Sequence, residues 1–128
     1  MLVVLMLVFI PFHSIYKLNK RLNYSDTYLK IGETIRQNTA RTDLIVLEDR
    51  SASAKFFYYS HRKGWGHAIS EKISSSLLDD YIERGATHYV MANYDPQKAN
   101  PALYSLLKSN HQLLLQEKYV TLFKLTKQ

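Results

Sequence analysis

The first twelve residues, MLVVLMLVFIPF, form an apolar run without a single charge. As a helix at about 1.5 Å per residue the run would span roughly 18 Å, whereas the hydrocarbon core of a bilayer measures about 30 Å. It lacks the basic start and the small-residue cleavage site of a signal peptide. We interpret residues 1–12 as the end of a transmembrane helix, with Met1 an internal methionine or a misplaced start. The alternative is a buried N-terminal helix or strand.

Basic side chains follow this apolar run at once. Lys17, Lys20 and Arg21 lie where lysine and arginine favour anionic lipid headgroups, so we expect lipid headgroups among the partners of the chain. Basic residues beside a membrane helix usually mark its cytoplasmic end. We predict that residues 1–22 are a helix end with a basic junction, and that residues 23–128 form one soluble α/β domain.

The periodicity of the next segments predicts a helix and then a buried strand. Tyr28, Ile31 and Ile35 recur at helical spacing, and Ser25 is a suitable cap for that helix. The run from Asp43 to Asp49 is continuously apolar between flanking acids. This pattern is typical of an interior parallel strand that is covered on both faces.

Helical and strand patterns alternate through the remainder of the chain. Ser70 is the expected cap of a helix that Gly85 ends, and Asn100 followed by Pro101 predicts the start of another. Further elements are expected as a short helix at 51–59 and as strands at 64–69, 87–92, 111–116 and 119–125. The sequence therefore predicts an α/β fold, a three-layer sandwich with a small, mostly parallel sheet and a C-terminal β-hairpin.

Composition and charge narrow the possible functions. The chain has 128 residues and no cysteine, which excludes a disulfide framework, thiolate metal ligands and a cysteine nucleophile. Its net charge of +6 comes from cations that alternate with acids along the chain, whereas a nucleic-acid interface would concentrate them. We therefore expect no nucleic-acid partner.

Motifs for nucleotides, metals and serine hydrolysis do not occur in the sequence. Gly64-Trp65-Gly66 lacks the third glycine of a dinucleotide fingerprint, and no glycine-rich loop ends in Lys-Ser or Lys-Thr. No serine occupies a GxSxG turn. The five histidines have no metal-ligand spacing; they are His13, His61, His67, His88 and His111. We predict no metal, no cofactor and no catalytic residue in this chain.

Polar side chains follow two of the expected strands. Glu48, Asp49 and Arg50 end the first strand, and the segment 93–95, which closes with Asp95, follows a later one. If both strands are parallel, these groups meet at the carboxyl edge of the sheet, where ligands usually bind. Glu48, Asp49 and Asp95 are therefore candidate ligand-binding residues, and two carboxylates there could do acid/base work. The alternative is the ordinary polarity of strand ends.

The segment 56–66, FFYYSHRKGWG, combines aromatic and cationic residues. Aromatic rings beside cations can stack on sugars and donate hydrogen bonds to hydroxyls or phosphates, so Arg62, Lys63 and Trp65 are candidate ligand-binding residues. In the alternative reading the aromatics belong to the core, Gly64 makes a turn and Trp65 covers an edge.

Two motifs carry a family resemblance: Tyr58-Tyr59-Ser60-x-Arg62-Lys63-Gly64-Trp65, and further along Arg84-Gly85-Ala86-Thr87-His88-Tyr89. The chain resembles the extracytoplasmic C-terminal domain of bacterial dolichyl-phosphate-mannose-protein mannosyltransferase-like membrane glycosyltransferases, relatives of the aminoarabinose transferases. The resemblance implies polyprenyl-phosphate sugar donors and a transmembrane bundle, absent from this chain, that holds the catalytic acid. It also implies a periplasmic position for the domain, whereas the basic junction by itself would suggest the cytoplasmic side of the membrane.

Three functions follow as hypotheses. The first is an accessory domain of such a transferase, and the second is an independent membrane-tethered module that binds a glycan, a peptide or an anionic lipid. The third is a small soluble enzyme that uses Glu48, Asp49 and Asp95. We predict the first.

Overall fold

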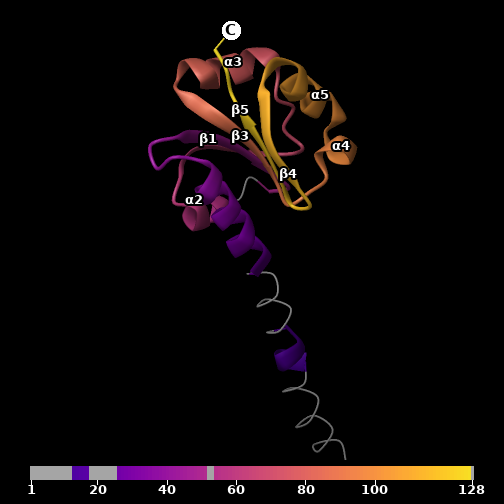
Figure 1. Ribbon diagram of the computed structural model, residues 1–128. Helices are drawn as coiled ribbons and strands as arrows, with labels where there is room; N and C mark the ends of the chain where they lie inside the picture. Colours follow the sequence, from indigo (N-terminus) through magenta and orange to yellow (C-terminus); the bar gives the residue numbers. More distant parts are fainter. Residues whose placement is uncertain (1–12, 18–25, 52–53, 128) are drawn as a thin grey trace, which may run out of the picture.

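The computed structural model describes residues 13–17, 26–51 and 54–127. The apolar run, Lys20 and Arg21 of the junction, and the expected cap Ser25 lie outside these residues. Short helices cover 13–17 and, as the first helix of the domain, 26–38. The labelled elements of Figure 1 follow in the order β1 (Leu44–Asp49), α2 (Lys55–Ser60), β2 (Lys63–Ala68), α3 (Ser75–Glu83), β3 (Ala86–Ala92), α4 (Pro96–Ala99), α5 (Pro101–Asn110), β4 (Gln112–Glu117) and β5 (Val120–Lys124).

The five strands form one mixed sheet in the order β2-β1-β3-β5-β4. β1 lies between β2 and β3 and is parallel to both, as its covered apolar sequence predicts. β5 runs antiparallel to β3, and β4 pairs with β5 as the expected terminal hairpin. The predicted α/β fold is confirmed, with parallel pairing in the first half of the sheet and antiparallel pairing in the second.

Alternate residues of the strands face two separate hydrophobic cores. Ile45 and Leu47 of β1 pack with Ile31 and Ile35 of the helix 26–38 and with Phe56 of α2. The intervening Val46 belongs to the opposite core, together with the buried faces of α3 and α5. Helices therefore cover both faces of the sheet, which is the predicted three-layer sandwich (Figure 1).

The helix 26–38 contacts α2 through a glycine. A Cβ atom added to Gly32 would lie 2.5 Å from the Cβ atom of Tyr59 and 2.8 Å from the carbonyl carbon of that residue. Since real Cβ atoms do not approach this closely, Gly32 lets the two helices pack backbone to backbone. Both can then lie on the same face of the sheet.

The direction of the helix 26–38 places its first residues at the carboxyl edge of the parallel strands. The helix ends beside a tight turn, in which the Ala40 N–H donates to the Asp43 carboxylate at 2.7 Å, and β1 then starts back in the opposite direction. Tyr28, near the beginning of the helix, packs on Phe56, which follows the end of β1, with ring centroids 4.9 Å apart. In the described part of the chain, no helix combines the length and hydropathy needed to cross a membrane.

One local expectation from the sequence was wrong. The cap of α3 is Ser74, whose hydroxyl accepts a hydrogen bond from the Leu77 N–H at 3.2 Å, so Ser70 is not the cap. The short helix α4, which Asp95 caps and Pro96 begins, was not predicted from the sequence. In contrast, Gly85 ends α3 as predicted, with a φ of 98° that favours glycine.

Candidate functional site

Glu48 lies at the centre of a buried hydrogen-bond network near the carboxyl edge. Its side chain has 0% exposure, although it is a potentially charged group at the end of a strand. One carboxylate oxygen accepts from the Tyr89 hydroxyl at 2.6 Å, and the other accepts from the Tyr94 hydroxyl at 2.7 Å and the Asn100 side-chain amide at 3.0 Å. Three donors therefore replace the water that burial removes.

The two tyrosines of this network remain hydrogen-bond donors. Burial raises the pKa of the Tyr89 hydroxyl well above its ordinary value, and the negative charge of Glu48 raises it further. Burial and Glu48 raise the pKa of Tyr94 in the same way. A proton that cannot leave either hydroxyl suits a structural network better than proton transfer.

The network joins segments that are distant in the sequence. Glu48 is in β1, Tyr89 is in β3, Tyr94 is in the loop that follows β3, and Asn100 precedes α5. The expected position of Asn100 at the start of α5 is confirmed, but its side chain makes no cap hydrogen bond, and its amide nitrogen donates to Glu48. The carboxylate thus anchors the loop and the start of α5 to the sheet.

The other two candidate acids have separate local roles. Asp49 is 3% exposed and accepts a hydrogen bond from the Ser51 N–H at 2.9 Å, while strand alternation points it to the face opposite Glu48. Asp95 caps α4 by accepting from the Gln97 N–H at 3.1 Å, and its carboxylate lies 3.7 Å from the Lys98 ammonium. The structure brings Glu48 and the 93–95 segment to one edge, as predicted, but with the three carboxylates engaged in different contacts.

Arg62 holds the end of the helix 26–38. It is 8% exposed, and its guanidinium donates to the Arg36 carbonyl at 2.9 Å, the Thr39 carbonyl at 2.6 Å and the Thr39 hydroxyl at 2.8 Å. Further hydrogen bonds reach the carbonyls of Ser60 and His61. A cation at the C-terminal end of a helix satisfies unpaired carbonyls and complements the helix dipole. Arg62 therefore has a structural role, and ligand binding by it stays a prediction.

Lys63 and Trp65 lie on the opposite face of β2 from Arg62. Lys63 is exposed, while Trp65 is half-buried against Tyr81 of α3, with ring centroids 5.1 Å apart. His67 packs on the same tyrosine at 5.2 Å, and its Nδ1 lies 3.2 Å from the Glu71 carboxylate. Among the described side chains, the buried Nε2 of His67 has no hydrogen-bond partner. The alternation along β2 thus separates Arg62 from Lys63 and Trp65, although the three candidate residues are close together in the sequence.

Gly64 is required by the sheet. Its φ is 149°, and an added Cβ atom would collide with the Ile45 carbonyl oxygen of the neighbouring strand β1. The glycine therefore permits close approach of β2 and β1 within the expected strand, whereas the alternative interpretation had Gly64 making a turn.

The residues that sequence reasoning missed are Tyr89 and Asn100. The sequence placed Tyr89 in a strand and in the second resemblance motif, and Asn100 at a helix cap, without a site role for either. The available signal was the acid Glu48 at an interior position of a covered strand, since a buried carboxylate needs donors from elsewhere in the fold. The described residues contain no group of three histidine or acidic side chains that could hold a metal ion.

Comparison of the chain with models of protein families, with curated proteins and with solved structures found no match.

Proposed function

We propose that this chain is an accessory domain of a polytopic membrane glycosyltransferase that uses a polyprenyl-phosphate-linked sugar donor. The domain lies on the periplasmic face of a bacterial inner membrane and has no catalytic residues of its own. Its partner is a transmembrane bundle that belongs to the same protein. The two motifs around Tyr58–Trp65 and Arg84–Tyr89 support the family, and the apolar run with its basic junction supports attachment to a membrane.

The observation that carries the non-catalytic role is the state of Glu48. A catalytic carboxylate must reach its substrate, whereas Glu48 is fully buried and accepts three hydrogen bonds from its own fold. Asp49 is nearly as buried, and Asp95 caps a helix. The contacts of Glu48, Asp49 and Asp95 with their own fold support a structural role for these acids over acid/base work.

The reading frame upstream of Met1 tests the partner. A frame that continues upstream through many further apolar segments would support a single polytopic protein, whereas an authentic start codon with a ribosome-binding site at Met1 would rule it out. Fusion of alkaline phosphatase after Gln128 tests the side of the membrane, because this reporter is active only outside the cytoplasm. We expect an active fusion, and an inactive but stable one would contradict the periplasmic position.

Turnover by the purified full chain tests the catalytic assignment. Incubation with a radiolabelled polyprenyl-phosphate sugar should give neither transfer nor hydrolysis. Turnover that disappears in Asp49→Asn or Asp95→Asn, with the fold retained, would favour the small-enzyme hypothesis instead.

The alternative of an independent tethered module rests on β2, where Lys63 is exposed and Trp65 is partly accessible beside it. Its test is glycan or lipid-phosphate binding that Lys63→Ala and Trp65→Ala remove. Arg62 is unsuitable for this test because its substitution would also release the helix 26–38. A wild-type chain that binds no such ligand would leave this alternative without support.

A further inference from the structure

Exposed apolar side chains precede the domain and lie in its first helix, in α2 and in the β4–β5 hairpin. Six large ones are exposed, namely Ile15, Tyr16, Leu29, Tyr58, Leu114 and Tyr119. The first two precede the domain, and Leu29 lies in the first turns of the helix 26–38. Tyr119 is in the turn between β4 and β5, and Tyr58 is the most exposed of them at 75%. Within the described residues, none of the six lies on α3 or α5.

Two lysines of these elements lie over tyrosine rings. The Lys55 ammonium is 5.3 Å from the ring centroid of Tyr28, and the Lys118 ammonium is 5.0 Å from that of Tyr119. Tyrosine combines an apolar ring with a polar hydroxyl at its tip, and lysine extends a charge beyond its apolar stem. This combination is typical of side chains at a membrane–water interface.

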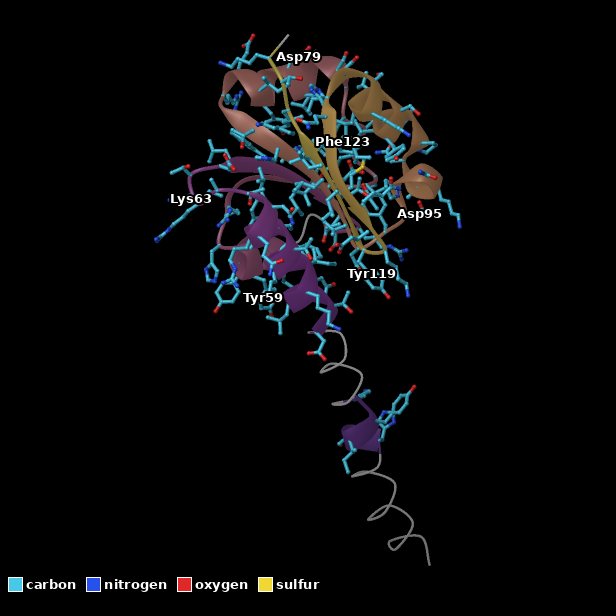
Figure 2. The ribbon with its side chains drawn as sticks, in the orientation of Figure 1. Tyr59, Lys63, Asp79, Asp95, Tyr119 and Phe123 are labelled. Atoms are coloured by element: carbon cyan, nitrogen blue, oxygen red, sulfur yellow. The ribbon has the colours of Figure 1, made fainter. Side chains whose placement is uncertain are left out.

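The fold places both lysine–tyrosine pairs at the carboxyl edge of the sheet. Val120, next to Tyr119, pairs with Ala92, the last residue of β3, and the helix 26–38 begins at the same edge. Figure 2 shows Tyr59 and Tyr119 on either side of this helix, at the end of the domain nearest to the segment 13–17, with Asp79 at the far end. In the sequence, the helix 26–38 follows the basic junction and the apolar run.

We propose that the surface formed by Leu29, Lys55, Lys118 and Tyr119, here called the edge surface, lies on the headgroup layer of an anionic bilayer. This inference rests on the membrane attachment in the proposed function and adds the orientation of the domain. A lipid surface fits better than a protein partner, because lysine is depleted in protein–protein interfaces but favours anionic headgroups. The orientation turns the carboxyl edge with the Glu48 network toward the membrane, and α3 and α5 away from it.

Depth-dependent fluorescence quenching tests this orientation in the full chain. Because the sequence contains no cysteine, single cysteines can be labelled specifically. Glu117→Cys, beside the edge surface, and Asp79→Cys, on α3, each replace one exposed acid and form a matched pair. Each variant is labelled with bimane and bound to phosphatidylcholine–phosphatidylglycerol vesicles that contain a headgroup nitroxide lipid. The label at 117 should lose most of its fluorescence, whereas the label at 79 should keep most of it.

A pair of charge reversals tests the role of the lysines. Lys55→Glu with Lys118→Glu should reduce the quenching at position 117, because like charges repel the anionic headgroups. Lys108→Glu with Lys127→Glu changes the net charge equally, on exposed residues away from the edge surface, and should leave the quenching unchanged.

The outcomes separate this inference from the proposed function. A chain that floats with vesicles but shows equal quenching at positions 79 and 117, or stronger quenching at 79, overturns the orientation and leaves membrane attachment intact. A folded chain that does not float with the vesicles overturns the membrane attachment and the orientation together.

Discussion

Tyr94 donates a hydrogen bond of 2.7 Å to the Glu48 carboxylate, and so joins the loop after β3 to the neighbouring strand β1. The two residues are 46 positions apart in the sequence. Neither group can reach water, because Glu48 is 0% and Tyr94 is 6% exposed. The contact therefore makes the stability of the domain depend on a carboxylate, although hydrophobic residues form both cores around it.

Replacement of Glu48 by leucine should strongly destabilise the domain. Leucine would leave two tyrosine hydroxyls and the Asn100 amide without their acceptor, and each buried unsatisfied group costs about 1–3 kcal/mol. We expect a loss of roughly 3 kcal/mol or more in the free energy of unfolding, measured by urea denaturation. Glu117→Leu, at an exposed site, is the control. Equal stability of the two variants would show that the network contributes little.

Removal of the Tyr94 hydroxyl tests a single arm of this network. Tyr94→Phe keeps the ring in the core and removes one of three donors to the carboxylate, so we expect a cost of about 1–2 kcal/mol. Tyr58→Phe removes the same atom from a side chain that is 75% exposed and should change the unfolding free energy by less than about 0.5 kcal/mol. Thermal unfolding of both variants under one set of conditions makes the comparison.

Arg62→Lys should not behave as a conservative change. Lysine has three donors on one nitrogen and cannot reproduce the separate bonds of the guanidinium to the Thr39 hydroxyl, the Thr39 carbonyl and the Arg36 carbonyl. We expect a loss of about 2 kcal/mol and faster amide hydrogen exchange in the helix 26–38. Lys63→Ala, at an exposed neighbour, should change neither quantity. Unaltered hydrogen exchange in the Arg62 variant would contradict the role of Arg62 in holding the end of the helix 26–38.

Alanine at three glycines should give a graded series of stabilities. Gly64→Ala should prevent the pairing of β2 with β1, because its Cβ atom would overlap the Ile45 carbonyl oxygen. Gly32→Ala would force the helix 26–38 away from Tyr59. Gly85→Ala meets no atom closer than 3.7 Å and adds only backbone strain, which costs about 1–3 kcal/mol. Circular dichroism during urea unfolding should rank the variants in this order, and a different order would contradict the packing described.

Mild acid should destabilise the domain through His88. Burial lowers the pKa of His88 below its ordinary value of 6.5. The carboxylate of Asp43, 3.5 Å from the ring, raises this pKa, and the positive charge of Lys124 lowers it further. The unfolded chain therefore takes up a proton at higher pH than the folded chain does. The contribution of His88 to the free energy of unfolding is fully present above about pH 6.5. It decreases as the pH falls toward the lowered pKa of the folded chain.

The variant His88→Gln checks the assignment of this pH dependence. The unfolding free energy of the wild type should decrease between neutral pH and pH 5, and the decrease should be smaller in the variant. Burial also lowers the pKa of His111, so part of the slope should remain. An identical slope in both proteins would remove His88 as its source.

Local sequence patterns were sufficient for the elements and for the fold class. The apolar run of β1 between two acids indicated a covered parallel strand, and the two β-rich runs around Glu117-Lys118 indicated the terminal hairpin. These predictions succeed because periodicity and turn chemistry act over a few residues. The position of the 93–95 segment beside the end of β1 also followed, since neighbouring parallel strands end at a common edge.

The partners of individual side chains did not follow from local patterns. In the run Leu113–Leu115, regular alternation would place the first and third leucines on one face. A register shift instead puts Leu113 against Phe123 in one core and Leu115 in the other, with Leu114 exposed. The irregularity depends on pairing with β5, which no single segment specifies.

The sequence by itself determined most of the helices and strands, the α/β class, and the absence of cysteine and of nucleotide-binding motifs. Only the tertiary structure decided that Glu48 is buried among donors from three segments, that Arg62 holds a helix end, and that Lys63 and Trp65 lie on the other face of β2. The reason is physical: periodicity is a property of neighbouring residues, whereas desolvation and hydrogen-bond partners depend on which distant segments pack together.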